Sequence, residues 1–453
     1  MTRWWKRVRL NTKRCAVAAL AYASLMPALA AAETLTLDDA VRVALDRNAG
    51  LRATSEQVEV AESQAKTARA GFSPQLNARY TVRRSNNPLD SLADKLNTRS
   101  IDPATDFTAD ALNHPDYTTL HATEIGVQWP LYTGGRSLAE FGAARAQVSA
   151  AEDERERARE RVIYDTTLAY RGAQAAHAGL TVADEAVAAA ERHARTTARL
   201  LRDRRIVASD KLTAEVNLSL VEANRAQAHT RRENAFDALR RALGLAHDAP
   251  LAVMNWDAEP VLPALPPLTE LEQQALARRA DLRAEEHRLR AARAGVRAAR
   301  AAFKPQLSIG AARTWYDDSF NLDNASNSVM GQVQWNLWSG GQHTERMRAA
   351  THGAAALEAQ LEDRRAGVLL EVRTAYRALA EARTRLGICA DNIDKANKTV
   401  ELVQGRYGEG RTLLIDLLQA ERTLVDARRE KLEAQSALAR AEADLRYAIG
   451  GAP

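Results

Sequence analysis

The chain has few cysteines, prolines and aromatic residues for its length. Among 453 residues there are 2 cysteines and 13 prolines, and aromatic residues make up 5% of the composition. We expect Cys15 to be removed with an N-terminal signal, which would leave Cys389 alone and allow no intrachain disulfide. Packing must therefore hold the fold together. The Ala- and Arg-rich composition predicts that this fold is mostly helical.

The sequence also lacks the usual signs of catalysis. Its nine histidines show no metal-ligand spacing, and no nucleophile elbow or phosphate-binding loop occurs. We therefore predict that the chain is not an enzyme and that it needs no cofactor or metal.

The N-terminus has the pattern of a secretory signal peptide at 1–32. Basic residues precede an apolar stretch of about 15 residues and then small residues, so we expect cleavage after Ala30 or Ala32. A transmembrane anchor is the alternative, but the apolar stretch is shorter than the roughly 20 residues that a spanning helix needs. Cys15 precedes the apolar stretch, which predicts no lipid anchor. The basic residues are Arg3, Lys6, Arg7, Arg9, Lys13 and Arg14.

Signal removal changes the charge of the mature chain. The loss of six basic residues lowers the formal net charge from +5 to −1. Because nucleic-acid binding depends on an excess of positive charge, we predict no nucleic-acid partner.

The mature chain contains an internal duplication. Phe72-Ser-Pro-Gln-Leu76 returns as Phe303-Lys-Pro-Gln-Leu307, and Gln128-Trp-Pro-Leu-Tyr132 returns as Gln334-Trp-Asn-Leu-Trp338. The offsets are about 231 and about 206 residues, so one element is roughly 25 residues longer in the first copy, as expected of a variable loop. We predict a first repeat at 33–245, a Pro-rich connector at 246–268 and a second repeat at 269–453.

Each repeat should contain three helices. We expect helices at 38–70, 135–204 and 209–243, and again at 269–302, 341–404 and 412–449, because these stretches lack proline and carry helical periodicity. In the last one, Leu417, Ala420, Leu424, Ala427 and Leu438 follow the alternating three- and four-residue steps of a coiled coil. Alanine at many of these positions predicts close helix approach and a thin core.

Between the helices the periodicity changes to two. We predict one β-hairpin at about 75–133 and another at about 305–338, with strands of roughly 8 to 11 residues, the length that crosses a bilayer at a tilt. Trp129, Tyr132, Trp335 and Trp338 lie near strand ends, as expected for aromatics at a membrane interface. Four strands cannot close a barrel, whereas three chains would supply about 12. Ordinary hairpins on a soluble helical protein are the alternative.

This duplicated pattern resembles the TolC family of outer membrane efflux proteins over nearly the whole mature chain. The resemblance implies a mainly α protein with membrane β: a homotrimer with a shared 12-stranded β-barrel in outer membrane lipid, continued by a periplasmic α-barrel of long coiled-coil helices. It also implies two protein partners, a periplasmic adaptor and an inner-membrane transporter of the ABC or proton-driven kind. The expected location is the outer membrane, spanning into the periplasm.

The resemblance also suggests where the periplasmic tip lies. Asp416 would belong to a ring of carboxylates in a constricted pore, while Tyr407 and Arg411 would make the polar contacts that hold it shut. Alternatively, Asp416 is a solvated residue that suits a helix start. Asp210 marks the first tip, where the family usually has a glycine near Arg204. Gln419 replaces a further aspartate of some members.

Two choices of function stay open at this stage. A periplasmic coiled-coil adaptor or structural protein would share the helices and the secretion, but it would not need hairpins edged with tryptophan. Within the channel interpretation, two features slightly favour type I protein secretion over drug or small-molecule efflux. They are the sequence pattern of 411–421 and the expected absence of a lipid anchor.

Overall fold

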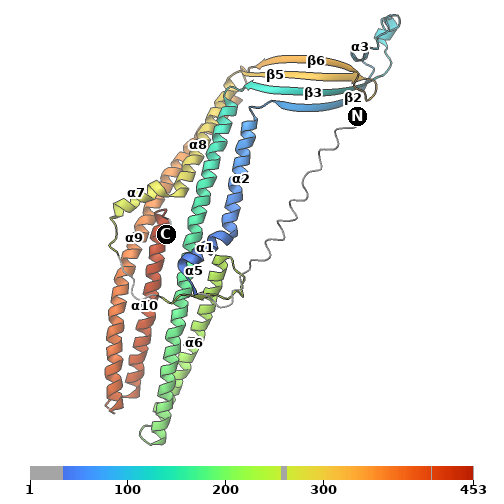
Figure 1. The fold of residues 1–453 in the computed structure, drawn as a ribbon. Helices are drawn as coiled ribbons and strands as arrows, with labels where there is room; N and C mark the ends of the chain where they lie inside the picture. Colours follow the sequence, from blue (N-terminus) through green and yellow to red (C-terminus); the bar gives the residue numbers. More distant parts are fainter. Residues whose placement is uncertain (1–33, 257–262, 410, 452–453) are drawn as a thin grey trace. The chain divides into compact units, whose positions relative to one another are not determined.

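The computed structural model describes residues 34–256, 263–409 and 411–451. The expected signal peptide and Gly410 lie outside the described residues. The duplication is visible in the order of the larger elements (Figure 1). The first copy contains α1 (Leu37–Arg47), α2 (Ala49–Ala70), β2 (Gln75–Ser85), β3 (Thr118–Tyr132), α5 (Arg136–Arg202) and α6 (Ala208–Leu243). The second contains α7 (Leu268–Arg278), α8 (Ala280–Arg300), β5 (Gln306–Asp317), β6 (Asn324–Gln334), α9 (Gln342–Gly408) and α10 (Leu414–Ala448).

The long helices confirm the prediction from periodicity. Helices α5 and α9 each have 67 residues. At 1.5 Å per residue, each is about 100 Å long. Alanine is the commonest buried residue type along α9 and α10, at positions that include Ala354, Ala375, Ala382, Ala427 and Ala434. The expectation of small residues at the buried positions is therefore confirmed.

Two of the expected helices are interrupted. The stretch 38–70 divides into α1 and α2 at Asn48, and 269–302 divides into α7 and α8 at Arg279. The two breaks are about 231 residues apart, which is the offset of the repeat. At the first break, the side-chain oxygen of Asn48 accepts a hydrogen bond from the backbone N–H of Leu51 (3.0 Å) and caps α2. Continuous helices were predicted because neither Asn48 nor Arg279 is a glycine or proline. That prediction was wrong.

The four long strands form one antiparallel sheet in the order β2-β3-β5-β6 (Figure 1). Both predicted hairpins are confirmed, and β3 joins them by pairing with β5. Strand β6 ends at Gln334, so Trp335 and Trp338 follow the strand instead of lying in it. Strands β2 and β6 form the two edges of this sheet. A second sheet consists of the short parallel pair β1 (Thr34–Leu35) and β4 (Ala252–Val253).

Alternation gives the large sheet one apolar and one polar face. Opposite side chains in register share a face. The apolar face includes Leu76 opposite Val127 and Ala78 opposite Ile125, and the polar face includes Arg79 opposite Glu124. Large apolar residues such as Leu76, Val82 and Val329 are mostly exposed. An apolar sheet face is thus presented to the surroundings.

Glycine pairs connect strands to the long helices. Gly134 and Gly135 have φ of 69° and 91°, and Gly340 and Gly341 have φ of 62° and 85°. A Cβ atom at Gly134 would lie 2.6 Å from the carbonyl oxygen of Ala301. Both the backbone conformation and the close approach therefore require glycine at this position.

The chain forms two compact units, each containing segments of both repeats. The first includes residues 34–47, 165–263 and 382–440, and the second includes 48–164, 264–381 and 441–451. In the first unit, the hydroxyl of Tyr170 donates to the carbonyl of Leu35 (2.7 Å), and Gln174 Nε2 donates to the carbonyl of Met254 (2.9 Å). The second unit contains the large sheet. It also holds the enlarged loop, with α3 (Pro88–Asn97) and α4 (Ala109–Asn113), and the single turn η1 (Ala301–Phe303).

Candidate functional site

The ends of the two helical hairpins pack together in the first unit. One end joins α5 to α6, and the other joins α9 to α10. Ala214 of α6 and Leu414 and Leu418 of α10 form a buried apolar cluster, against which Tyr407 of α9 packs. Three helices from both repeats therefore contribute to this tip cluster.

The charge of Asp210 acts on the hydroxyl of Tyr407, and both residues were predicted at the tips. Burial raises the pKa of the Tyr407 hydroxyl, and the negative charge of Asp210 raises this pKa further. Asp210 lies in the first turn of α6. The phenol therefore stays protonated well above neutral pH, beside a carboxylate from the opposite hairpin.

Asp416 makes the contacts of a helix cap. Its Oδ2 atom accepts hydrogen bonds from the Thr412 hydroxyl (2.7 Å) and from the backbone N–H of Leu413 (3.3 Å). Asp416 is exposed and lies in the first turn of α10, where a carboxylate also suits the helix dipole. These contacts support the capping interpretation, and the role of Asp416 in a pore stays a prediction.

Arg411 and Gln419 take part in other contacts of the same region. Arg411 Nη1 lies 3.1 Å from Glu409 Oε2, in an exposed ion pair. Gln419 lines a groove of about 260 Å³ between α6 and α10, together with Leu212, Val216 and Ile415. The predicted tip residues thus share one region, but their contacts are separate: Tyr407 packs against the tip cluster, Asp416 bonds Thr412, and Arg411 pairs with Glu409.

The first tip forms its turn without the glycine usual in the family. Arg204 adopts φ of 59°, in the left-handed region that favours glycine. Its backbone N–H donates to the carbonyl of Leu201 (3.0 Å), and that of Arg205 donates to the carbonyl of Leu200 (2.9 Å). These are the hydrogen bonds of a helix C-terminus that ends in a left-handed residue. The C-terminus of α5 is therefore closed without glycine, with arginine in a strained conformation.

Sequence reasoning missed the polar contacts between the two hairpins. His193 Nε2 of α5 lies 2.6 Å from Glu421 Oε1 of α10, and Arg428 Nη1 of α10 lies 2.7 Å from Glu185 Oε2 of α5. Arg422 also donates to the side-chain oxygen of Asn217 in α6 (3.2 Å). Because charged residues are frequent along all of these helices, the sequence carries no signal that would match these partners.

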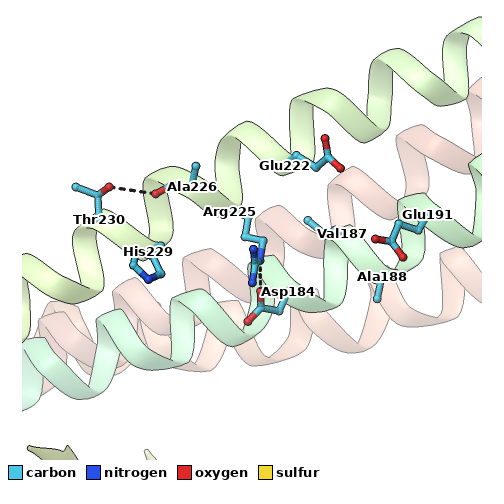
Figure 2. Close-up of a pocket in the computed structure, with 9 residues that line it drawn as sticks. All are labelled: Asp184, Val187, Ala188, Glu191, Glu222, Arg225, Ala226, His229 and Thr230. Atoms are coloured by element: carbon cyan, nitrogen blue, oxygen red, sulfur yellow. Dashed lines mark hydrogen bonds and ion pairs between the residues drawn. The ribbon is translucent and has the colours of Figure 1, made fainter.

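A groove of about 850 Å³ lies between α5 and α6 (Figure 2). Arg225 of α6 reaches Asp184 of α5 across it, with Nε 2.5 Å from Oδ1. Val187, Ala188 and Ala226 supply small apolar side chains that leave this space between the helices. The rest of the lining consists of Glu191, Glu222, His229 and Thr230. Within the described residues, no group of three or more His, Cys, Asp or Glu side chains could hold a metal ion.

A buried arginine organises the break between α7 and α8 in the second unit. Arg279 is fully buried and donates from Nε and Nη2 to the two carboxylate oxygens of Asp281 (2.9 and 2.7 Å). Its Nη1 pairs with Glu371 and donates to the carbonyl of Ala448 (3.3 Å). Burial opposes ionisation of Asp281, but hydrogen bonds from Arg279 and Arg364 outweigh it and hold the pKa of this carboxyl below its usual range.

The tryptophans predicted at a membrane interface make equivalent contacts in the two repeats. Trp129 Nε1 donates to the carbonyl of Phe72 (2.8 Å), and Trp335 Nε1 donates to the carbonyl of Phe303 (3.0 Å). Tyr132 and Trp338 are exposed. Each indole thus links the end of one hairpin strand to the backbone just before the other strand of the same hairpin. Among the described residues, no helix has both the length and the apolar character needed to cross a membrane.

Comparison with known proteins adds to this geometry. A sequence profile for the outer membrane efflux protein family matches residues 40–245 and 271–451. The chain is 27% identical over 250 residues to alkaline protease secretion protein AprF of Pseudomonas aeruginosa, covering 53% of this chain and only 51% of AprF. It is 27% identical over 429 residues to toluene efflux pump outer membrane protein TtgF of Pseudomonas putida, covering 91% and 82% of the two chains.

A solved structure has the same fold. The chain matches the Campylobacter jejuni CmeC outer membrane channel with a TM-score of 0.79 at 17% identity, over 92% of this chain and 85% of that chain. The profile match covers most of both repeats, which confirms the family resemblance seen in the sequence. The chain therefore belongs to the outer membrane efflux protein family, whose members are outer-membrane channels that extend into the periplasm and are not enzymes.

Proposed function

We propose that three copies of this chain form the outer-membrane exit channel of a tripartite export system. One observation carries this proposal: among the described residues, β2 and β6 are the edges of the large sheet, each paired on one side only. Open edges are not tolerated in lipid, and about eight strands is the smallest closed number. Three copies would close a barrel of about 12 strands by pairing each β6 with the β2 of the next copy.

The two faces of the sheet support this assembly. Apolar side chains such as Leu76 and Val82 would contact outer membrane lipid, and the polar face with Arg79 and Glu124 would line the lumen. Trp129, Tyr132, Trp335 and Trp338 would then anchor the ends of the strands at the interface. The helices of about 100 Å would continue the tunnel through the periplasm as an α-barrel.

The hairpin ends would meet the other parts of the system. Large apolar residues are unusually exposed there, and contiguous exposed apolar surface indicates a protein interface. They include Val207, Leu212, Val216, Leu413 and Ile415. A periplasmic adaptor and an inner-membrane transporter are the partners that this surface would serve, because nothing in the sequence supplies energy for transport.

The tip residues would form the periplasmic gate. Tyr407 packs against the tip cluster, which includes Ala214 of the other hairpin, so the loss of this packing would loosen the closed tip. Asp416, three times around the axis, would favour cations and repel its own copies, while Arg411 and Gln419 would complete the polar rim. Asp416 would then both cap α10 and supply charge to the pore.

For the cargo, we favour a protein delivered by a type I secretion system. The similarity to AprF, which is a protease secretion protein, supports this choice. Efflux of small molecules is the second candidate, supported by the longer alignment with TtgF, a toluene efflux pump protein.

Deletion and complementation in the source bacterium test the function. A secretion channel predicts that a protein disappears from the culture medium while tolerance of toxic solvents stays the same. An efflux channel predicts the reverse. Membrane fractionation and native mass spectrometry of the purified protein test the assembly, and finding a soluble periplasmic protein would instead support an adaptor or structural role.

A further inference from the structure

Helix α3, in the enlarged loop between β2 and β3, has its polar side inward and its apolar side outward. Ser91 and Asp94 are each only 3% exposed, whereas Leu89 is 79% and Leu96 is 57% exposed. Leu89, Ala93 and Leu96 follow the i, i+4, i+7 spacing of one helix face, and all three are exposed. We call this set the outer face of α3. A surface helix usually has the opposite arrangement, so this face calls for an explanation.

The structure of α3 is well specified locally. Asn87 caps the helix by accepting hydrogen bonds from the backbone N–H groups of Leu89 (3.0 Å) and Asp90 (3.4 Å), and Pro88 occupies the first turn. Further along the loop, Lys95 Nζ lies 2.5 Å from Asp106 Oδ1. The exposed leucines are thus held on an ordered helix.

Salt bridges and hydrogen bonds attach α3 to the polar face of the sheet. Arg83 of β2 contacts Asp90 (2.7 Å) and Asp94 (2.5 Å), and the Thr118 hydroxyl of β3 donates to Asp94 (3.0 Å). Ser85 also donates to Asp90 (2.9 Å). Arg83 and Ser85 are two residues apart in β2, and Ser85 pairs with Thr118, so all three side chains belong to one face.

That face is the polar one, which would line the lumen of the proposed barrel. Arg83 follows Arg79 and Thr81 in the polar row of β2, and Figure 1 shows α3 at the end of the sheet where β2 and β3 connect. Arg99, just after α3, donates to the carbonyl of Ala325 in β6 (3.4 Å). The loop therefore reaches from the first hairpin to the second, and α3 is attached to the polar face with its outer face exposed.

We propose that the outer faces of three α3 helices meet each other and close the outer mouth of the channel. This inference rests on the proposed trimer, because only a closed barrel brings three copies to one axis. The occupant of the outer face is then a second copy of this chain. Contact between copies removes the leucines from water, which is favourable for apolar surface.

Membrane lipid is the less suitable occupant of this face. Lipid would contact the apolar face of the sheet, and α3 is attached to the other one. In addition, the loop at 86–117 contains six aspartates but only Lys95 and Arg99 as basic residues. This excess of negative charge does not suit binding to anionic lipid headgroups, which attract basic segments.

The test uses the full-length protein in lipid nanodiscs with the photoreactive residue p-benzoylphenylalanine in place of Leu96. The matched control carries the same residue in place of Phe107, which is exposed in the same loop but lies outside α3. Native mass spectrometry of the unirradiated sample first establishes the trimer. A sample that is not trimeric would contradict the proposed assembly itself.

In a confirmed trimer, we expect irradiation of the position 96 variant to crosslink two chains, with the adduct mapping to α3 of the second copy. The yield of crosslinked chains should be far higher than for the position 107 variant. Lipid adducts, or equal chain joining at both positions, would overturn the inference and leave the proposed trimer intact. The double variant Leu89→Asn, Leu96→Asn should also raise the single-channel conductance in planar bilayers. Unchanged conductance in an intact trimer would rule out closure of the mouth by α3.

Discussion

Replacing Arg279 by methionine removes a buried positive charge while keeping a side chain of similar length. In the native chain this guanidinium bonds both oxygens of Asp281 and also contacts Glu371 and the carbonyl of Ala448. Its loss removes two hydrogen bonds from the Asp281 carboxylate and the guanidinium hydrogen bond from the Ala448 carbonyl. The break between α7 and α8, and the C-terminal end of α10, both depend on this cluster.

The size of the effect follows from the exposure of the partners. Removing one member of a buried ion pair costs about 3–5 kcal/mol. Glu371 is 44% exposed, so its share is screened by solvent, and Asp281 keeps a second bond from Arg364 (2.8 Å). We therefore expect Arg279→Met to lower the free energy of unfolding by about 2–3 kcal/mol. At about 2–4 °C per kcal/mol, the midpoint should fall by roughly 6 °C.

Arg364 offers a matched control for this variant. It contacts the same two carboxylates but is 42% exposed. An exposed ion pair contributes about 0–1 kcal/mol, so Arg364→Met should lower the midpoint by no more than about 4 °C. The measurement is thermal unfolding of the purified trimer in detergent, followed by circular dichroism. Equal losses in both variants, or an unchanged midpoint for Arg279→Met, would refute the argument that burial makes Arg279 the stronger of the two.

Three further predictions concern the tips and the buried cluster. Arg204→Gly should relieve the left-handed strain of about 1–2 kcal/mol, partly offset by about 0.5–1 kcal/mol of glycine entropy. The midpoint of thermal unfolding should therefore rise slightly, whereas Arg202→Gly in the helix should lower it. Asp416→Asn keeps an acceptor for Thr412 but removes the charge, so bilayer recordings should show weaker cation block if Asp416 belongs to the pore. If the cation block changes in Asp416→Ala but not in Asp416→Asn, Asp416 has only a capping role. Because its folded pKa is lowered, Asp281 stabilises the fold fully above about pH 4 and loses this effect as the pH falls further, so Asp281→Asn should flatten the fall of the unfolding midpoint between about pH 4 and about pH 2.

Periodicity in the sequence was sufficient for the larger elements. The spacing of apolar residues predicted the long helices and all four long strands, because each of these elements is specified by its own residues. The breaks at Asn48 and Arg279 were not predicted. One depends on a side-chain cap and the other on ionic partners that lie far away in the sequence, and neither has a local breaker residue.

The tip could be predicted only in part. The duplicated sequence located both turns, and the resemblance suggested Tyr407 and Asp210 as tip residues. Tyr407 packs against the tip cluster, and the charge of Asp210 acts on its hydroxyl. The left-handed Arg204 and the contact between His193 and Glu421 could not be predicted, because helix faces rich in charge allow many partners. The same reason applies to α3, whose inverted polarity depends on Arg83 in a neighbouring strand.

The duplication also predicts how one copy should join the next in the proposed trimer. Within the chain, β3 ends the first hairpin and pairs with β5, which begins the second, and Val127 lies opposite Ala311. Between copies, β6 of one chain would meet β2 of the next in the same relation. Val127 corresponds to Val333 at the repeat offset of about 206, and Ala311 corresponds to Tyr80 at the offset of about 231. Val333 should therefore lie opposite Tyr80, with both on the apolar face. Cysteines at these two positions should form a disulfide between chains of the purified trimer, whereas a cysteine pair shifted by one residue would place its members on opposite faces and should not.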